Sequence, residues 1–219
     1  MKVTGLKVKR GQRQIAVFWW AAIFVFVALG ATRAWTQSTR TASPPSSGEL
    51  TLNLDPVQSK LHWTLGSTLH TVHGTFALKR GVVRFDPASG NASGEIAADA
   101  ASGESGNESR DKKMHSEILE SARYTEVVFR PDRIEGKVLT QGASNVGVHG
   151  TFVLHGAEHE LVVPVQAELS GEHWKGSAKF SVPYIQWGLK SPNTFFLKAD
   201  PAVEIELEMS GTVQTATPR

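Results

Sequence analysis

The segment Val203–Met209 (VEIELEM) alternates strictly between apolar and acidic residues. Successive side chains of a β-strand point to opposite faces, so this segment predicts a strand with one buried face and one face in water. The same period of two recurs in residues 50–54, 61–65, 161–169 and 174–182. Strands with one wet face are typical of antiparallel sheets.

Turn-forming residues separate these segments at short intervals, as at Asp55-Pro56, Asp86-Pro87, His155-Gly156 and Ser170-Gly171. Many short strands divided in this way favour a sandwich or a barrel. Closing the sheet removes exposed edges, which are an aggregation hazard for strands this apolar. We therefore expect an all-β antiparallel fold, either a sandwich or a barrel, and a barrel of about eight strands would just enclose side chains or one slim ligand.

A short internal echo lies within two of the predicted strands. Val72–Leu78 (VHGTFAL) recurs as Val148–Leu154 (VHGTFVL), with six of seven positions identical. Glycine in mid-strand indicates a bulge, a barrel corner or a close approach to the backbone. Two interpretations stay open: an internal duplication, or two strands that meet similar packing demands.

The stretch Gly106–Phe129 departs from the period of two. Asn107 is a suitable N-cap residue, and acidic residues follow in the first turn, where the helix dipole favours them. Met114 and Ile118 are four residues apart and, with Tyr124, form a candidate apolar stripe. We expect one or two short helices inserted mid-chain and packed across the sheet.

An ordered set of motifs runs from Leu52 to Ser210. It consists of Gly106-Asn107, Arg110-Asp111, Tyr124 before a strand ending at Phe129, His155-Gly156 before an apolar run through Pro164-Val165, and, more loosely, Phe180, Gly188 and Phe195–Leu197. This pattern resembles the YceI-like family, although Thr125 stands where that family usually has proline.

The resemblance implies a small exported bacterial protein whose fold is a lipocalin-like, extended antiparallel β-barrel of about eight strands. It also implies that the barrel binds polyisoprenoids or similar long apolar chains. Aromatic and branched residues at inward parity are the candidates to line an elongated apolar tunnel, alongside the plain core. They are Trp63, Leu65, Val72, Phe76, Phe129, Val148, Phe152, Val163, Trp174, Phe180, Ile205 and Leu207. Arg110, Lys112 and Lys113 near the helix start are candidates to hold a pyrophosphate or carboxylate head group, or are solvated charges.

The segment Tyr184–Phe196 (YIQWGLKSPNTFF) is aromatic and irregular. Long irregular segments between strands often carry function at the end of a barrel. We expect either a lid or rim loop, or a wide hairpin packed over one barrel end.

Composition excludes several classes of protein. The net charge of +2 comes from a basic N-terminal cluster, so the folded part has no basic footprint for nucleic acid. The chain has no cysteine, which excludes disulfides, thiolate metal sites and a cysteine nucleophile. It has no phosphate loop, dinucleotide fingerprint or nucleophile elbow. We predict no catalytic residues and no cofactor.

Histidines are the remaining candidates for metal binding. His155 and His159 are placed to chelate a metal across a turn, but no spacing among the eight histidines is diagnostic of a metal site. Surface positions on strands explain them more simply. We therefore predict no metal site.

The first 34 residues carry basic residues and then the apolar run Ile15–Ala31. Two interpretations stay open for residues 1–34, a cleaved signal peptide or a retained membrane anchor, and both place the rest of the chain outside the cytoplasm. Residues 35–48 are rich in Ser, Thr and Pro and predict a flexible linker. The barrel domain is expected at residues 49–211 and a disordered tail at 212–219.

Three hypotheses for function follow. The first is non-catalytic binding, sequestration or transport of a long-chain isoprenoid or other lipid by an exported protein that is periplasmic, secreted, or anchored in the inner membrane and facing the periplasm. The second is a structural or stress-protective envelope protein whose barrel is filled by side chains. The third, a metal-dependent enzyme, has the least support. A homodimer is compatible with a carrier, but no sequence feature specifies an interface.

Overall fold

The computed structural model describes residues 48–139 and 141–216 of the chain. The predicted N-terminal signal or anchor, and nearly all of the predicted linker, lie outside these residues. Within the described part, no helix is long and apolar enough to cross a membrane. The strands are β1 (Leu50–Leu54), β2 (Lys60–Leu65), β3 (Val72–Phe76), β4 (Leu78–Phe85), β5 (Ala92–Asp99), β6 (Glu126–Glu135), β7 (Gly142–Leu154), β8 (Ala157–Ser170), β9 (His173–Val182) and β10 (Val203–Thr215). The helical segments are η1 (Ala100–Ser102), α1 (Glu108–Lys113) and η2 (Met114–Ile118).

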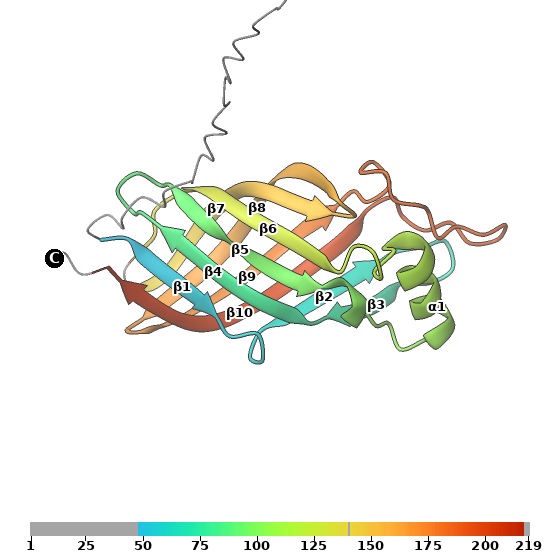
Figure 1. The fold of residues 1–219 in the computed structure, drawn as a ribbon, viewed down its shortest axis with the longest axis horizontal. Coiled ribbons are helices and arrows are strands. Elements are labelled where there is room, and N and C mark those ends of the chain that lie inside the picture. Colours follow the sequence, from blue (N-terminus) through green and yellow to red (C-terminus); the bar gives the residue numbers. More distant parts are fainter. Residues whose placement is uncertain (1–47, 140, 217–219) are drawn as a thin grey trace, which may run out of the picture. The chain divides into compact units, whose positions relative to one another are not determined.

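Eight strands close a ring in the order β1-β4-β5-β6-β7-β8-β9-β10, and β10 pairs back with β1 (Figure 1). Every neighbouring pair is antiparallel. The predicted all-β antiparallel barrel of about eight strands with a short helical insertion is confirmed. Closure leaves each strand with one face inside and one in water, which is what the alternation in β8, β9 and β10 requires.

At two of the eight positions in the ring, two strands follow one another in place of one continuous strand. β2 pairs with Glu204–Glu208 of β10, whereas β1 pairs with Gly211–Thr215 of the same strand. β1 and β2 therefore lie one after the other along the same edge of β10. Asp55 shapes the break, because its carboxylate accepts hydrogen bonds from the backbone N–H of Val57 at 2.9 Å and of Gln58 at 3.2 Å. β3 and β4 are the other such pair of successive strands and are separated only by Ala77.

β10 is longer than expected. Residues 212–215, predicted to begin a disordered tail, pair with β1, and Leu50 lies opposite Thr215. Val213 is buried in the core, so the alternation that starts at Val203 continues through the barrel wall. Hydrogen bonds to β1 explain why this segment is ordered despite its polar composition.

Two β-bulges change which residues face inward. In β4 the register shifts between Leu78 and Arg80, so Lys79 and Arg80 both lie outside while Leu78 and Gly81 are buried. β6 shifts in the same way between Pro131 and Arg133. A bulge adds one residue to a strand, and the inward positions therefore change from even to odd in β4 and from odd to even in β6.

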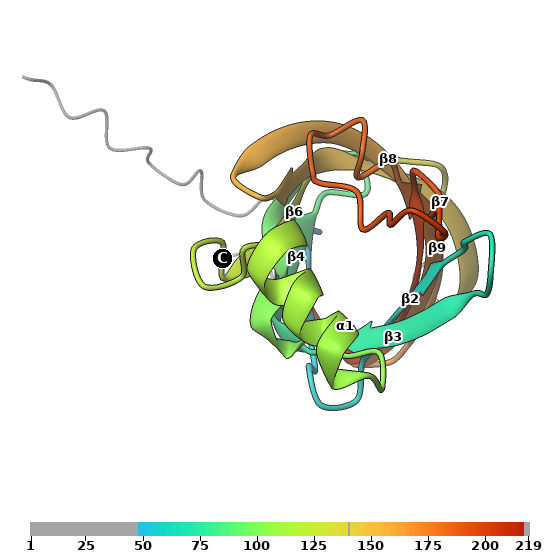
Figure 2. The same ribbon diagram turned by 90° about the vertical axis from the view of Figure 1, so that its right-hand side faces the viewer.

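The two ends of the barrel differ. At the closed end, side chains fill the interior, and the Trp174 indole N–H donates to the Asn53 carbonyl at 3.2 Å. The buried residues of this plug are Leu50, Phe85, Leu169, Trp174, Met209 and Val213. The other end, the mouth, is bordered by α1, the β2–β3 loop and the β9–β10 connection (Figure 2).

The predicted helix is present and begins at its predicted cap. The Asn107 side chain accepts a hydrogen bond from the Arg110 N–H at 3.0 Å, and α1 continues as the π-helical turn η2. His115 fastens this segment, with Nε2 2.8 Å from the Gly103 carbonyl and Nδ1 3.1 Å from the Ser121 hydroxyl. Tyr124 does not join the apolar stripe, because the chain turns at Glu120 and the Tyr124 ring packs on His155.

Candidate ligand-binding cavity

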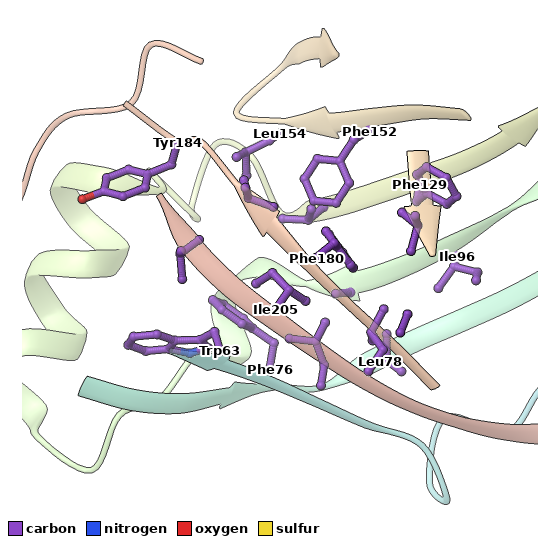
Figure 3. A pocket seen from close by; sticks show the side chains of 18 of the residues that line it. Trp63, Phe76, Leu78, Ile96, Phe129, Phe152, Leu154, Phe180, Tyr184 and Ile205 are labelled. Carbon is purple, nitrogen blue, oxygen red and sulfur yellow. The ribbon is translucent and has the colours of Figure 1, made fainter. Parts of the chain in front are cut away.

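The barrel encloses a cavity of about 520 Å³ between the plug and the mouth (Figure 3). Small side chains on three strands leave this room, at Ala98, Ala167 and Ala178. Below the mouth the wall consists of apolar side chains, since every strand turns its apolar face inward. Ligand pockets for small molecules are typically of about 300–1,000 Å³ and mostly apolar, so this cavity is of ligand-binding size.

All twelve side chains predicted from inward parity line the cavity. Trp63 and Phe76 lie toward the helix, and Phe129, Phe152, Phe180 and Ile205 lie along the wall (Figure 3). The remaining six are Leu65, Val72, Val148, Val163, Trp174 and Leu207. Trp174 also belongs to the plug, so it forms the floor of the cavity. Contact of these residues with a ligand stays a prediction.

Sequence reasoning left out many further lining residues. Leu50, Leu52 and Leu61 share the alternation that identified the others and were within reach of the same argument. Val83, Phe85 and Ile134 follow bulges, so counting by twos from the strand start would have placed them outside. Part of the lining comes from the helical segment. β3 pairs along its length only with β2, and on its other side the helical segment closes the wall with Met114, Ile118 and Leu119.

Of the three predicted head-group residues, Arg110 and Lys113 line the mouth of the cavity and Lys112 does not. An α-helix turns about 100° per residue, so positions 110, 113 and 114 share one face while position 112 points elsewhere. Neither Arg110 nor Lys113 takes part in an ion pair among residues 48–139 and 141–216. Both are therefore available to an anionic group at the mouth.

Ser105 fixes the position of Arg110. The guanidinium donates from Nε to the Ser105 hydroxyl at 2.7 Å and from Nη2 to the Ser105 carbonyl at 2.9 Å, while that hydroxyl donates to Asp111. Burial raises the pKa of the Asp111 carboxyl, but the hydrogen bonds from Ser105 outweigh burial and leave the pKa below its ordinary value. Arg110 and Asp111 thus form a structural unit through Ser105 rather than a direct pair.

The segment Tyr184–Phe196 lies over the mouth end of the barrel. Tyr184 and Leu189 are buried, and the Tyr184 hydroxyl donates to the Asp200 carbonyl at 2.9 Å. Burial raises the pKa of Tyr184, which keeps the hydroxyl protonated as a donor. Pro192 and Thr194 line the cavity, so this connection is both a cover and a rim.

The paired histidines serve as packing surfaces. His159 stacks on Trp187 with ring centroids 4.1 Å apart and planes 3° from parallel, and His155 packs on Tyr124 at 4.2 Å. In the part of the chain that the structure describes, no three His, Cys, Asp or Glu side chains gather in a group that could hold a metal ion. His155 and Gly156 both have positive φ, 53° and 78°, as a two-residue hairpin turn requires.

The barrel has the same fold as several solved bacterial proteins. The described barrel is similar to BcnA of Burkholderia cenocepacia, with a TM-score of 0.61 at 17% identity, covering 73% of this chain and 99% of that one. A polyisoprenoid binding domain from Saccharophagus degradans, implicated in plant cell wall breakdown, has a TM-score of 0.55 at 14% identity, with 75% and 98% covered. The YCEI protein of Campylobacter jejuni has a TM-score of 0.51 at 18% identity, with 66% and 86% covered. The TM-scores show a shared fold, and at these low identities they show the fold alone.

No curated protein matches the chain in a sequence search. The family model for the YceI-like domain, however, matches residues 52–211, a range that begins in β1 and ends in β10. It includes β2 to β9 in full, parts of β1 and β10, the helical insertion and the cover of the mouth. The chain belongs to the YceI-like family.

Proposed function

We propose that the barrel binds one long apolar chain, a polyisoprenoid or a similar lipid, and shields it from water outside the cytoplasm without catalysing a reaction. The carrying observation is the cavity of about 520 Å³, enclosed by apolar side chains and open at one end. Transfer of a chain from water releases about 0.8 kcal/mol per CH₂ group, so affinity needs little polar chemistry. The Saccharophagus relative, a polyisoprenoid binding domain, supports this choice of ligand.

The head group is assigned to the mouth. Arg110 and Lys113 are the cationic residues of the cavity lining, with Ser67, His70 and Thr194 as polar neighbours from two loops. A phosphate or carboxylate there would receive charge-assisted hydrogen bonds while the chain lies among the aromatic side chains. The ligand class that fits both parts is a single-chain amphiphile with an anionic or strongly polar head.

The second hypothesis, a barrel filled by its own side chains, conflicts with the cavity. The large inward side chains of the barrel line the wall and form the plug, but Ala98, Ala167 and Ala178 are too small to fill the space between them. Export and a periplasmic, secreted or membrane-anchored location remain part of the proposal, and rest on the N-terminal sequence. The carrier would take its ligand from a membrane and protect it in an aqueous compartment.

Native mass spectrometry of Ser43–Arg219, incubated with a polyprenol, tests the proposal. A bound mass that organic solvent removes is expected for the wild type. Ala178→Trp places an indole inside the cavity and should abolish the bound species, whereas Ser177→Trp adds the same group on the exposed outer face of β9 and should not. If A178W unfolds, Ala167→Phe provides a smaller obstruction on β8. Absence of a bound polyprenol or acyl lipid in the folded wild type would refute carrier function.

A further inference from the structure

Two adjacent phenylalanines stand exposed at the mouth. Phe195 is 93% exposed and Phe196 is 81% exposed, and their rings pack edge to face with centroids 4.9 Å apart. They belong to the β9–β10 connection, which extends past the end of the barrel in Figure 1. Leu69, in the neighbouring β2–β3 loop, is 65% exposed. We call Leu69, Phe195 and Phe196 the mouth tip.

Hydrogen bonds hold the mouth tip in place. The backbone closes a tight turn from the Thr194 N–H to the Leu197 carbonyl at 2.9 Å, and the Asn193 side chain accepts from the Ala199 N–H at 2.7 Å. The two loops are joined by Thr68, whose N–H donates to the Lys198 carbonyl at 2.9 Å. These hydrogen bonds fix the backbone of the loop that carries the two exposed phenyl rings.

The loops that carry the mouth tip have more cationic than acidic residues. Residues 66–71 and 183–202 contain Lys190, Lys198 and His70, and their one acidic residue is Asp200. Lys190 lies 3.8 Å from Glu120, and Lys198 takes part in no ion pair among the described residues. Exposed aromatic rings flanked by lysines are the combination that favours the interface of an anionic bilayer.

We propose that the mouth tip docks on a lipid bilayer containing anionic lipids, with the two phenyl rings inserted at the interface. A protein partner is a poorer fit, because a stable protein interface buries about 800 Å² on each side and this feature is a narrow turn. Pro192, Thr194 and Leu197, beside the two phenylalanines, line the cavity. Docking would therefore bring the cavity opening against lipid, so an apolar chain could move between bilayer and barrel without crossing water.

The test uses Ser43–Arg219, because the N-terminal segment is itself expected to bind membranes. All the strands of the ring lie within residues 50–215, and the solved chain of BcnA is matched over 99% of its length, so a chain of this domain alone can fold. Flotation with phosphatidylcholine vesicles, with or without phosphatidylglycerol, measures partitioning. F195S/F196S should weaken partitioning about tenfold or more. The matched control is Val57→Ser, which removes an apolar side chain 93% exposed in the β1–β2 turn, and it should leave partitioning unchanged.

A second variant tests the contribution of the two lysines to vesicle binding. K190Q/K198Q should weaken binding about fivefold per lysine, and only to vesicles with phosphatidylglycerol. Equal partitioning of F195S/F196S and wild type, or no vesicle binding by the wild type, would overturn the proposal. Concentration-dependent dimers that F195S/F196S abolishes, without vesicle binding, would instead assign the tip to a second copy of the chain. Polyprenol binding in solution should survive F195S/F196S, so a failure of the wild type to bind polyprenol counts against the carrier function alone.

Discussion

The indole ring of Trp63 lies across Gly74 of the neighbouring strand, and no side chain larger than hydrogen fits beneath it. The two residues are paired in the β2–β3 register. A Cβ atom at Gly74 would come closer than van der Waals contact both to the Trp63 ring and to the backbone carbonyl of Glu104. The missing side chain at this position is what lets Trp63 line the cavity next to the helix.

Gly74→Ala should therefore destabilise the barrel by about 1–3 kcal/mol, the usual cost of overpacking, because the clash includes backbone that cannot move aside. Gly147→Ala is the matched control in β7, where the added Cβ would meet its nearest neighbour, Val162, at an ordinary 3.5 Å. Urea unfolding monitored by circular dichroism measures both. Equal stability of G74A and G147A would show that Trp63 can move without cost.

The internal echo has a physical explanation at its glycine. Gly150 of β7, the counterpart of Gly74, is covered by the Phe129 ring and the Arg130 carbonyl of β6. Each copy therefore places glycine beneath an aromatic ring from an adjacent strand and against a backbone oxygen. Similar packing demands therefore explain why both copies have glycine at this position.

Arg80 and Glu126 join two strands that are not neighbours, β4 and β6, on the outer face of the barrel. Arg80 binds both carboxylate oxygens of Glu126 at 2.8 and 2.9 Å, and Lys79 lies 2.9 Å from the same group. The β4 bulge makes this possible by placing Lys79 and Arg80 on the same face. The hydrogen bonds from Arg80 and then Lys79 lower the pKa of Glu126 from 4.5 to about 2.

This shift predicts a loss of stability in acid. The ionised form of Glu126 is favoured by folding, so its contribution is complete above pH 4.5 and disappears as the pH falls toward 2. Thermal unfolding between pH 6 and 2 should show a smaller difference between Arg80→Gln and wild type at low pH than at neutral pH. Arg130→Gln, which removes a single 3.3 Å contact to an exposed Glu158, is the control and should show little such convergence. A constant difference between R80Q and wild type would contradict the assignment.

Asn107 controls the order of the helical segment that borders the mouth. Asn107→Ala removes the hydrogen bond to the Arg110 N–H and should cost about 1 kcal/mol locally, whereas Asn107→Asp keeps an equivalent cap. We expect α1 to open locally without unfolding of the barrel, so hydrogen exchange by mass spectrometry is the suitable measurement. Amides in residues 108–118 should exchange about fivefold faster in N107A and unchanged in N107D. Equal exchange in N107A and wild type would mean that packing alone holds the helix.

Sequence reasoning succeeded where the backbone imposes a period. The inward positions of β8, β9 and β10 follow from alternation, which is why Val163, Phe180 and Ile205 were predicted to line the cavity. It failed where one inserted residue shifts that period, as before Val83 in β4. The mouth tip has no period at all, and its exposure depends on a turn and on a hydrogen bond to a distant loop through Thr68.

The head-group assignment depends on which helix positions face the cavity. Replacement of a cationic donor to a bound phosphate costs about 1.5–3 kcal/mol, so Arg110→Gln and Lys113→Gln should each weaken binding of a prenyl phosphate about tenfold to a hundredfold. Lys112→Gln removes the same charge from the adjacent exposed position and should change binding little. Binding of the uncharged prenol to all three variants should match the wild type, because the chain itself contacts the apolar wall.

Displacement of a fluorescent prenyl analogue measures these affinities. Hydrogen exchange of residues 108–118 checks that R110Q, which loses its hydrogen bonds to Ser105, keeps the helix. If R110Q and K113Q weaken prenol as much as prenyl phosphate, they act on the shape of the mouth; if K112Q weakens prenyl phosphate equally, the helix attracts anions through its overall charge and holds no specific head-group site.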